Sequence, residues 1–325
     1  MPSSTKSSIL VGVCTYQRPN LFHHCISSLA SLQHPENSNV SFVFVDNEGS
    51  GLVREIVNKS RASFGNATVY YEVEPERGIS NARNCILKKS IELKTDWVAM
   101  IDDDEVVAKD WLCNLMSEAK KYSADVISGF VVPKLPKSAP RFFEYTNLHG
   151  HSRRNQKPSW KRSAASGNVM ISTAIFKDGL SFDPQFNFTG GEDTHFFRLA
   201  HLQGVRILKT DKAEIKEIIP VSKATTNWYF KRKVGSAEAR IKIAIHTKGL
   251  FWGGIKAFEI FLPSIVIAPI SGVLYLLHPF FQHLLIKHVG RLIGVWNILT
   301  RKPSNFYLNV YDAADDELSD PDIYV

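Results

Sequence analysis

Four consecutive carboxylates, from Asp102 to Glu105, directly follow the apolar run Trp97-Val98-Ala99-Met100-Ile101. Carboxylates this close repel one another, and they stay ionised at neutral pH only when a cation or several hydrogen-bond donors compensate them. Oxygen ligands of this kind suit hard divalent cations such as Mg²⁺. The residues therefore predict a divalent metal site at the end of a buried strand. The alternative is an acidic turn that caps a following helix.

A second acidic pair, Glu192 and Asp193, follows the glycines of Thr189-Gly190-Gly191. The apolar spacing predicts a helix over residues 194–203, so both carboxylates would lie at its N-terminus, where the helix dipole favours anions. Asp193 is therefore a candidate general base for removing a proton from a hydroxyl group, with Glu192 beside it. Glu192 and His195 also have the spacing of a metal-binding pair, but without a second such pair we interpret this spacing as packing.

Short apolar runs alternate with helical patterns along the first hundred residues. The predicted strands are Ile9 to Cys14, Val40 to Val45, Val69 to Val73 and Trp97 to Ile101, and helices are predicted from an N-cap at Asn20, over 52–59 and over about 80–93. This alternation predicts an α/β fold with a doubly wound, mostly parallel, Rossmann-like sheet. Further strands are expected over 124–132 and from Ser166, separated by a proline-rich basic loop or lid.

The loops that carry polar residues all follow strands, so they should meet at one edge of the sheet, where ligands of such folds collect. A carboxylate triplet at one strand end and a distant Glu-Asp pair fit sugar transfer from a nucleotide diphosphate. Asp102 and Asp104 would hold Mg²⁺ or Mn²⁺ against the diphosphate. Asp193 would deprotonate a hydroxyl that attacks opposite the leaving group, which inverts the anomeric configuration.

Four further residues suit the donor side of such a site. Asp46 ends a predicted strand and can accept a hydrogen bond from a base or ribose, with a helix cap as the alternative. Arg83 or Arg77 can contact the nucleotide or its phosphates, with a surface ion pair as the alternative. Gly78 allows the backbone to approach a ligand, although a turn glycine explains it equally well.

The chain carries a net charge of +7, although its last residues, from Asp312 onward, are strongly acidic. Its basic clusters, around residues 153–162 and 231–248, suit phosphates or anionic lipid head groups. Nucleic-acid binding is the weakest interpretation because these clusters flank prolines and an apolar segment instead of an aromatic stacking platform. The four cysteines lack metal-type spacing and are predicted to be reduced core thiols, and the polar N-terminus predicts a cytosolic start.

Residues 260–286 contain no Asp, Glu, Lys or Arg and are long enough to cross a bilayer. Pro263, Pro269 and Pro279 interrupt this segment. We therefore expect a kinked span, a re-entrant pair or helices lying in the membrane interface, with a buried helical hairpin as the alternative. The predicted organisation is a catalytic domain over 1–245, an apolar and basic helical segment that associates with a membrane over 246–302, and an acidic, disordered tail over 303–325.

Six motifs, in this order, resemble glycosyltransferase family 2, in particular the bacterial exopolysaccharide branch typified by succinoglycan glucosyltransferases. The resemblance covers about residues 8–240. The motifs are Val13-Cys14-Thr15-Tyr16-Gln17-Arg18-Pro19, Val45-Asp46-Asn47, Glu74-Pro75-Glu76-Arg77-Gly78-Ile79-Ser80-Asn81-Ala82-Arg83-Asn84, Ile101-Asp102-Asp103-Asp104-Glu105, Ser166-Gly167-Asn168-Val169 and Thr189-Gly190-Gly191-Glu192-Asp193-Thr194.

The resemblance implies the GT-A fold, an inverting mechanism and particular residue roles. By it, Asp102 and Asp104 form the DxD metal site, Asp103 lies near the ribose and Asp193 is the general base. The residues that it places in the donor nucleotide pocket are Thr15, Tyr16, Arg18, Asp46 and Arg83. The chain departs from the family pattern at Lys216, where a histidine is frequent, and at Lys223, where an arginine is expected. Glu105 is expected only to start the next turn.

We therefore expect a metal-dependent inverting hexosyltransferase that moves a sugar from a UDP-sugar or similar donor to a hydroxyl of a lipid-linked or growing glycan. It would work on the cytoplasmic face of a membrane. One alternative is a nucleotidyltransferase that makes the activated sugar, although Thr15 to Asn20 lacks the glycines of a phosphate loop. The other is a membrane-tethered subunit that binds a sugar nucleotide or glycan without catalysis.

Overall fold

A computed structural model describes residues 6–146, 157–176, 179–302 and 304 of the chain. Contacts within it define two compact units. The first unit contains the described residues of Met1–Lys134, His149–Pro184 and Phe196–Ile218. The second contains the described residues of Leu135–Leu148, Gln185–His195 and Ile219–Val325. The three predicted consecutive domains stay a prediction, and the helix α6 (Thr226–Lys248) runs across the proposed boundary at residue 245.

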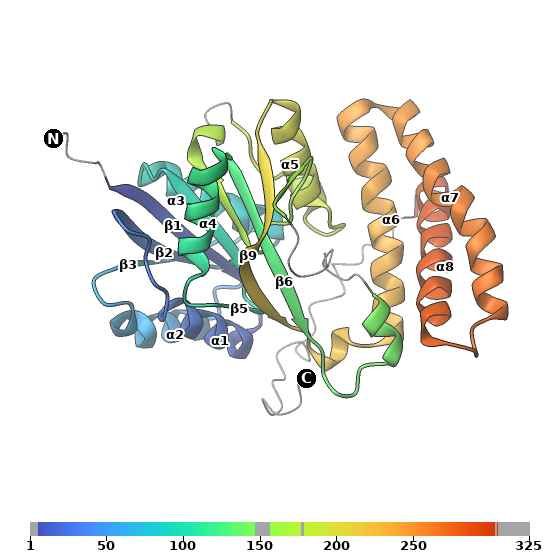
Figure 1. Ribbon diagram of the computed structural model, residues 1–325, viewed down its shortest axis with the longest axis horizontal. Coiled ribbons are helices and arrows are strands. Elements are labelled where there is room, and N and C mark those ends of the chain that lie inside the picture. The colour runs from blue at the N-terminus through green and yellow to red at the C-terminus, as the bar shows by residue number, and fades with distance from the viewer. Residues whose placement is uncertain (1–5, 147–156, 177–178, 303, 305–325) are drawn as a thin grey trace. The chain divides into compact units, whose positions relative to one another are not determined.

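Four parallel strands form one half of the sheet in the first unit, and they confirm the strands predicted from the first hundred residues (Figure 1). They are β1 (Ser7–Thr15), β2 (Ser38–Asp46), β3 (Thr68–Val73) and β4 (Trp97–Asp102), in the spatial order β3-β2-β1-β4. Thr15 pairs with Asp46, and Cys14 pairs with Asp102. The carboxyl ends of these strands are therefore level, and the loops that follow them begin at one edge.

Helices follow the first three strands. They are α1 (Pro19–Leu29), α2 (Leu52–Ser60) and α3 (Ile79–Glu92). The predicted N-cap at Asn20 is wrong by two positions, because Pro19 occupies the first helical turn and Arg18 is the N-cap. Proline is favoured there because its missing N–H has no partner within the helix.

The other half of the sheet mixes parallel and antiparallel strands. The full order is β3-β2-β1-β4-β8-β6-β9-β5, with β7 paired to β9. The added strands are β5 (Glu105–Val107), β6 (Val126–Lys134), β7 (Ser159–Lys161), β8 (Val169–Ser172) and β9 (Ile207–Ile218), and the helix α4 (Trp111–Tyr122) precedes β6. The strands expected over 124–132 and from Ser166 are present, the latter starting at Val169. β5, β7 and β9 were not predicted.

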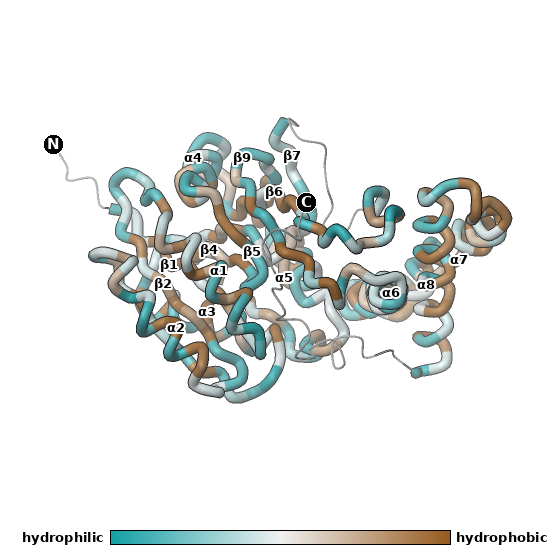
Figure 2. The backbone as a smooth tube through the Cα atoms, turned by 90° about the horizontal axis from the view of Figure 1, so that it is seen from below, coloured by the Kyte–Doolittle hydropathy of each residue, from teal (hydrophilic) through white to brown (hydrophobic). Residues whose placement is uncertain are grey.

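Apolar side chains cover both faces of this sheet. Trp111 and Phe22 belong to the buried cluster on one face, and Phe182 and Phe196 belong to the cluster on the other. Figure 2 shows hydrophobic segments in the central strands and again in the helices of the second unit. Both faces of the strands are buried, which explains why the sequence of each parallel strand is a continuous apolar run.

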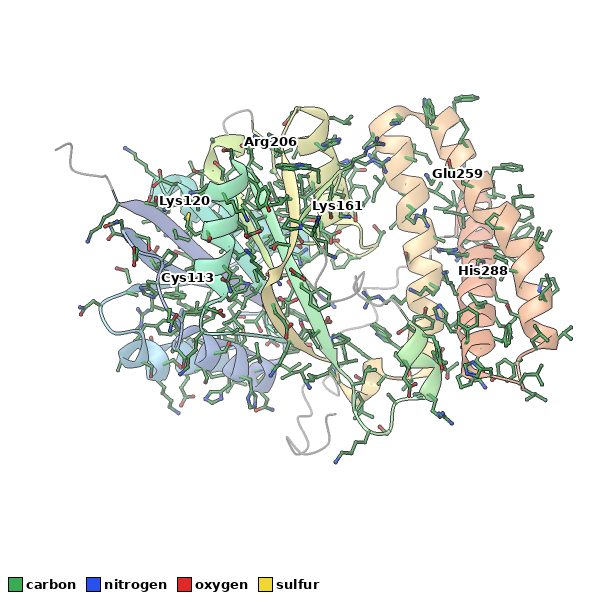
Figure 3. All side chains as sticks on the ribbon, viewed as in Figure 1. Cys113, Lys120, Lys161, Arg206, Glu259 and His288 are labelled. Carbon is green, nitrogen blue, oxygen red and sulfur yellow. The ribbon has the colours of Figure 1, made fainter. Side chains whose placement is uncertain are left out.

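The second unit is built around three long helices that pack on one another: α6, α7 (Leu250–Val273) and α8 (Pro279–Leu299). Pro279 begins α8, whereas Pro263 and Pro269 lie inside α7. His288 of α8 faces α7, and its Nδ1 atom lies 3.0 Å from Ser264 Oγ (Figure 3). The predicted apolar segment is thus a helical hairpin whose turn precedes Pro279.

Many apolar side chains of α7 are exposed. Val273 at its end is 84% exposed and Leu276 in the following turn 89%. Among the described residues, α7 alone has the length and hydropathy to cross a membrane. Of the predicted acidic tail, the structure describes only Ser304. Arg153 and Arg154 of the predicted lid also lie outside the described residues.

Candidate active site at the sheet edge

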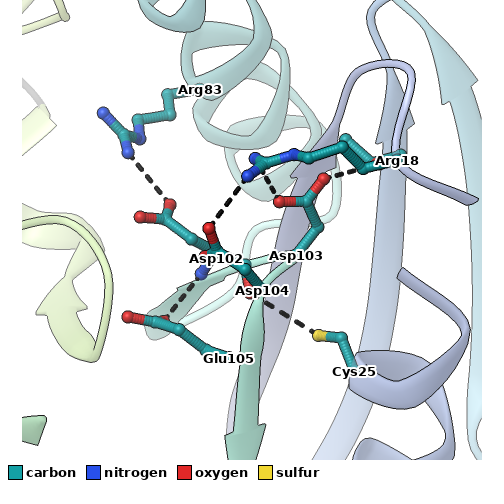
Figure 4. A network of polar contacts seen from close by, with 8 residues as sticks. Arg18, Cys25, Arg83, Asp102, Asp103, Asp104 and Glu105 are labelled. Carbon is teal, nitrogen blue, oxygen red and sulfur yellow. Dashed lines mark hydrogen bonds and ion pairs between the residues drawn. The ribbon is translucent and has the colours of Figure 1, made fainter. Parts of the chain in front are cut away.

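The acidic cluster lies where β4 ends, and Arg18 from the loop after β1 bridges two of its carboxylates (Figure 4). Arg18 Nη1 donates to Asp104 Oδ2 at 2.8 Å, and Arg18 Nη2 contacts Asp103 Oδ1. Thr15 Oγ1 donates to the other oxygen of Asp103 at 2.8 Å. The prediction that Thr15, Arg18 and the Asp triplet meet is confirmed, because the register of β1 with β4 brings both loops together.

Asp103 is the most enclosed member of the cluster. Its side chain is 0% exposed, and burial raises its pKa to about 7, against the lowering effect of the Arg18 guanidinium. The charge of Asp104 raises this pKa further, whereas the hydrogen bond from Thr15 lowers it. Asp103 therefore differs chemically from its neighbours, and its contacts leave it turned toward the protein.

Asp102 is the accessible member. Its side chain is 38% exposed, and Arg83 Nη2 of α3 donates to its Oδ1 atom at 3.0 Å. The Arg83 guanidinium lies over the Phe182 ring, with 5.8 Å between the Cζ atom and the ring centroid. Aromatic contact of this kind holds a guanidinium in place without neutralising it. Arg83 is thus positioned at the cluster, as predicted.

Glu105 is not the start of a turn, and that prediction is wrong. It begins β5, is buried, and its Oε2 atom accepts a hydrogen bond from the Asp102 backbone N–H at 2.8 Å. Across the strand pair it faces Glu217 of β9, which is also buried. Burial first, and then the charges of Asp102 and Glu217, raise the pKa of Glu105 well above its usual range.

The carboxyl pair of Glu105 and Glu217 was missed because the two residues are far apart in the sequence. Strand alternation was the available signal, since it places Glu217 inward and the neighbouring Lys216 outward. Lys216 is exposed, so the lysine substitution at this position does not bring a cation toward the carboxyl pair. Lys223 lies at the end of a short 3₁₀ helix (Val221–Lys223) in the second unit.

Gly167 leaves space beside these carboxylates. A Cβ atom at this position would lie 2.7 Å from Glu105 Oε1 and 2.9 Å from Asp102 Oδ2. The next residue, Asn168, has a φ of 61° and holds three elements together through its side chain. Its amide donates to the carbonyls of Phe130 and Ala213, and it accepts from Trp111 Nε1 at 2.8 Å.

The loops after β2 and β3 are tied together by Asn47, a residue that sequence reasoning did not single out as part of the site. Its amide donates to the Glu74 and Glu76 carbonyls at 2.7 and 2.9 Å, and its oxygen accepts from the Gly78 N–H at 2.8 Å. Gly78 has a φ of 147°, which favours glycine. The turn explanation for Gly78 is therefore supported, and its role toward a ligand stays a prediction.

Asp46 lies beside this loop and is fully buried. Its carboxylate accepts from the Tyr71 hydroxyl at 2.8 Å and from the backbone N–H groups of Glu48 and Gly49 at 2.9 Å each. Arg77 lies over the Tyr16 ring, with 4.8 Å between the Cζ atom and the centroid. Tyr16, Asp46 and Gly78 thus line adjoining loops of one sheet edge, as expected, and their contact with a nucleotide stays a prediction.

Glu192 and Asp193 lie at the N-terminus of α5 (Glu192–Leu202), as predicted, although the helix begins at Glu192 and not at residue 194; both belong to the second unit. Glu192 is buried and Asp193 is half-buried. Gly190 and Gly191 precede them with φ values of 73° and 92°. A Cβ atom on Gly191 would lie 3.0 Å from side-chain atoms of Ala239 and Ile243 in α6, so glycine is needed there for two reasons.

His195 supports the packing interpretation of its spacing with Glu192. Its ring stacks on Phe186 at a centroid distance of 4.7 Å, and it meets His246 edge-on at 6.1 Å. The four cysteines are free thiols, as predicted, although only Cys25 is fully buried. Cys25 Sγ donates to the Asp102 carbonyl at 3.7 Å and so contacts the backbone of the acidic cluster.

The donor atoms at the cluster fit a divalent metal ion that takes part of its ligands from a substrate. Asp102 and Asp104 supply hard oxygens, and Gly167 leaves room beside Asp102. Within the described ranges, no group of three or more His, Cys, Asp or Glu side chains is arranged to hold a metal ion. Mg²⁺ is commonly bound by one or two carboxylates together with phosphate oxygens and water, which matches this arrangement.

Comparison with known proteins identifies the family of the chain and proteins with a similar fold. The model of the family described as Glycosyl transferase family 2 matches residues 10–180. Succinoglycan biosynthesis protein ExoM of Rhizobium meliloti is 30% identical over 243 residues, which cover 73% of this chain and 75% of that protein.

Solved structures share the fold at low sequence identity. The mannosyltransferase PcManGT of Pyrobaculum calidifontis, in complex with GDP-Man and Mn²⁺, has a TM-score of 0.64 at 14% identity over 90% of this chain and 87% of its own. S. aureus TarS 1-349 in complex with UDP has a TM-score of 0.51 at 16% identity over 90% and 91% of the two chains. These neighbours confirm the predicted GT-A fold.

Proposed function

The chain belongs to glycosyltransferase family 2, and from this membership we propose that it is a metal-dependent, inverting hexosyltransferase. It takes a sugar from a nucleotide-diphosphate sugar, with a UDP-sugar as the first choice. The acceptor is a hydroxyl of a lipid-linked or growing polysaccharide. The observation that carries the proposal is the unequal acidic cluster at the carboxyl edge of four parallel strands, with an arginine on either side of it.

The donor side is supported by the loops that Asn47 ties together. Tyr16 and Arg77 offer an aromatic face and a cation, and Asp46 holds the loop after β2 in shape. A nucleotide base and ribose lie over such loops beyond the carboxyl ends of parallel strands. The structurally similar PcManGT binds GDP-Man, and TarS binds UDP and UDP-GlcNAc, which supports a nucleotide sugar as donor here.

The diphosphate and its metal ion are assigned to the accessible Asp102 and to Asp104, whose side chain is 11% exposed. Asp102 and Asp104 would hold Mg²⁺ or Mn²⁺, and Arg18 and Arg83 are near enough to contact diphosphate oxygens. A bound divalent ion neutralises charge on the departing nucleotide diphosphate. Asp103 faces Thr15 and Arg18 instead, so we assign it to the ribose side and to holding the loop after β1.

Asp193 is assigned as the general base, with Glu192 beside it. Both lie at the N-terminus of α5, where the helix dipole favours the ionised carboxylate that can accept a proton. A base that deprotonates the acceptor hydroxyl on the face opposite the leaving group gives inversion at the anomeric carbon. Thr194 Oγ1 donates to Asp193 Oδ1 at 3.2 Å, which restricts the orientation of this carboxylate.

The acceptor class and location are supported by two observations. The name of the 30% identical relative, succinoglycan biosynthesis protein ExoM, supports an exopolysaccharide product. The exposed apolar side chains of α7 support contact with a membrane. We place the enzyme on the cytoplasmic face of that membrane, with the α7–α8 hairpin lying in the interface or entering it.

The proposal is tested with a panel of nucleotide sugars and purified full-length protein, measuring nucleotide release and sugar transfer with and without EDTA. We expect release from one donor and a loss of about a hundredfold or more when EDTA removes the metal. Asp193→Asn should lower transfer by about 10² to 10⁴, the usual contribution of a general base. Asp110→Asn is the matched control, because Asp110 is an exposed carboxylate whose side chain makes no cap hydrogen bond.

Each outcome separates the alternatives. Nucleotide release that EDTA does not change contradicts the metal assignment. Formation of a nucleotide sugar from a sugar phosphate indicates a nucleotidyltransferase instead. Binding of a nucleotide sugar without transfer to any acceptor, unchanged by Asp193→Asn, indicates a binding subunit.

A further inference from the structure

Three cations lie along the contact between α6 and α8 and have no role in the proposed sugar transfer. Lys233 comes from α6, and Lys287 and Arg291 come from successive turns of α8. All three side chains are half-buried. We call these three residues the cationic seam.

Two glycines of α8 allow its close contact with α6. A Cβ atom on Gly290 would lie 3.0 Å from Lys233 Cβ, and one on Gly294 would lie 2.6 Å from the Val234 carbonyl oxygen. The helix backbones therefore approach without intervening side chains, and residues that flank Gly290 face the start of α6. Arg291 follows Gly290 directly and Lys287 precedes it by one turn, so both lie beside Lys233.

Among the described residues, no acid forms an ion pair with the cations of the seam. Burial lowers the pKa of Lys233 to about 7, and the charges of Arg232, Lys287 and Arg291 lower it further. Burial also lowers the pKa of Lys287 and of Arg291.

The acids of the three packed helices make other contacts. Glu238 of α6 accepts hydrogen bonds from Asn297 and from the backbone and side chain of Ser304. Glu259 of α7 pairs with Lys256. Burying like charges without a counterion is costly, and an anionic ligand would offset this cost.

Polar and aromatic groups enclose one end of the seam. Lys233 Nζ lies 4.7 Å from the centroid of the Tyr229 ring, and the Tyr229 hydroxyl lies 3.0 Å from His283 Nδ1. His283 is one turn before Lys287 on α8. The seam thus combines half-buried cations with aromatic and hydrogen-bonding groups of the same two helices.

The same unit also presents an apolar surface. The turn between α7 and α8 and the adjoining part of α7 expose Val273, Leu276, Leu277 and, at the start of α8, Phe280. A ligand that combines a compact anion with a hydrocarbon chain matches a unit that holds both features.

We propose that Lys233, Lys287 and Arg291 bind the diphosphate group of a lipid-linked acceptor, while the exposed apolar side chains of the hairpin contact its hydrocarbon environment. This inference rests on the proposed function and names the part of the acceptor that the helical unit recognises. A diphosphate matches three cations better than the single charge of a phospholipid phosphodiester. Lys287 and Arg291 donate to it from one helix and Lys233 from the other.

The test measures binding of the full-length protein to phosphatidylcholine vesicles of three kinds. One kind carries a long-chain prenyl diphosphate, one carries phosphatidylglycerol at the same total negative charge, and one carries neither. We expect the prenyl diphosphate vesicles to bind at least about tenfold more tightly than the charge-matched vesicles, because charged hydrogen bonds to a diphosphate each contribute about that factor. Soluble inorganic pyrophosphate should compete.

The variant Lys287→Gln/Arg291→Gln should lose this preference by about tenfold or more, with thermal unfolding confirming that it is folded. The matched control is Lys242→Gln/Lys248→Gln, which removes two cations from α6 outside the seam. Lys242 is half-buried like the seam residues, and burial lowers its pKa, but the nearby charge of Glu238 opposes this lowering. Binding of the donor nucleotide is measured on every preparation and should not change.

Equal binding to the prenyl diphosphate and phosphatidylglycerol vesicles would overturn the inference, because it indicates a non-specific response to anionic surfaces. An equal loss in the control variant would overturn it for the same reason. The inference is supported if the seam variant, unlike the control, loses its preference for prenyl diphosphate vesicles and still binds the donor nucleotide. Selective vesicle binding by a protein that binds no sugar nucleotide supports the anion site while contradicting the proposed function.

Discussion

Replacing Arg18 with Met should destabilise the first unit, and the loss should be larger at alkaline than at acidic pH. Arg18 Nη1 donates to Asp104 Oδ2 at 2.8 Å, and its Nη2 atom contacts Asp103. Methionine keeps an apolar stem of similar length and removes both contacts. Among the described residues, Thr15 would then be the one remaining hydrogen-bond donor to the Asp103 side chain.

The magnitude follows from the burial of Asp103, whose side chain is 0% exposed. Breaking a buried ion pair on one side costs about 3 to 5 kcal/mol while the remaining charge stays ionised. Because Asp103 can take up a proton, we expect about 3 kcal/mol above pH 8 and about 1 kcal/mol near pH 5.5.

The sign of the pH dependence comes from the raised pKa of Asp103. Its pKa of about 7 in the folded protein exceeds the ordinary value of 3.8, so its ionisation destabilises the fold as pH rises toward and through 7. Arg18 opposes this by lowering that pKa, so its removal raises the pKa further. Well below pH 7 both proteins carry a protonated Asp103, and the loss of Arg18 then affects mainly Asp104.

Thermal and urea unfolding in EDTA, followed by circular dichroism, measure the effect. A loss of about 3 kcal/mol corresponds to a fall in Tm of about 6 to 12 °C for a unit of this size. The double variant Arg18→Met/Asp103→Asn should recover most of the stability because it removes the uncompensated charge. A loss that is the same at both pH values, or a double variant no more stable than Arg18→Met, would refute the reasoning.

Three further changes test other parts of the structure. Gly191→Ala should lower the free energy of unfolding by about 2 kcal/mol, measured by thermal unfolding, and by more than Gly204→Ala. Both glycines have φ near 90°, but of the two only Gly191 would bring a Cβ atom against neighbouring side chains. Equal losses of stability in the two variants would contradict this. Glu217→Gln should lower the pKa of Glu105, seen as ionisation of a carboxyl at lower pH by isotope-edited infrared spectroscopy, because one raising charge is removed; an unchanged titration would disprove their coupling. Lys233→Met should stabilise the ligand-free protein by about 2 kcal/mol near pH 6 and by less near pH 10. The pKa of Lys233 in the folded protein is about 7, below the ordinary 10.5, so the ionised lysine destabilises the fold fully below pH 7 and progressively less above it. Destabilisation by this variant near pH 6 in thermal unfolding would contradict the reasoning.

The parallel half of the sheet was predictable because strands buried on both faces are continuous apolar runs. Ile9 to Cys14 and Val40 to Val45 are such runs, and helical spacing separates them. β5 has only three residues, which is too short for a periodic signal. β9 alternates buried and half-buried or exposed residues from Ala213 to Glu217, yet the charges among them obscured the pattern.

The site was predictable as a set of residues and not as a set of contacts. The motifs placed Thr15, Arg18 and the Asp triplet at one edge, and the structure agrees. Which carboxylate turns inward depends on the register of β1 against β4, which no local pattern reveals. The pairing of Glu105 with Glu217 depends on a strand contact between segments more than a hundred residues apart.

For the proposed transfer reaction, the contacts of the acidic cluster also bear on the order in which metal and donor would bind. Asp102 and Asp104 each already pair with a guanidinium group, that of Arg83 and that of Arg18 respectively. A divalent ion added alone would therefore place positive charge beside two arginines that already engage the carboxylates. A nucleotide diphosphate supplies the negative charge that lets these arginines turn to phosphate oxygens and release Asp102 and Asp104 to the metal.

We therefore expect Mn²⁺ to bind at least about tenfold more tightly in the presence of the donor nucleotide than in its absence, measured by calorimetry. Linkage requires the affinity for the nucleotide to rise by the same factor when the metal is present. Equal Mn²⁺ affinity with and without nucleotide would show that the arginines do not oppose the metal.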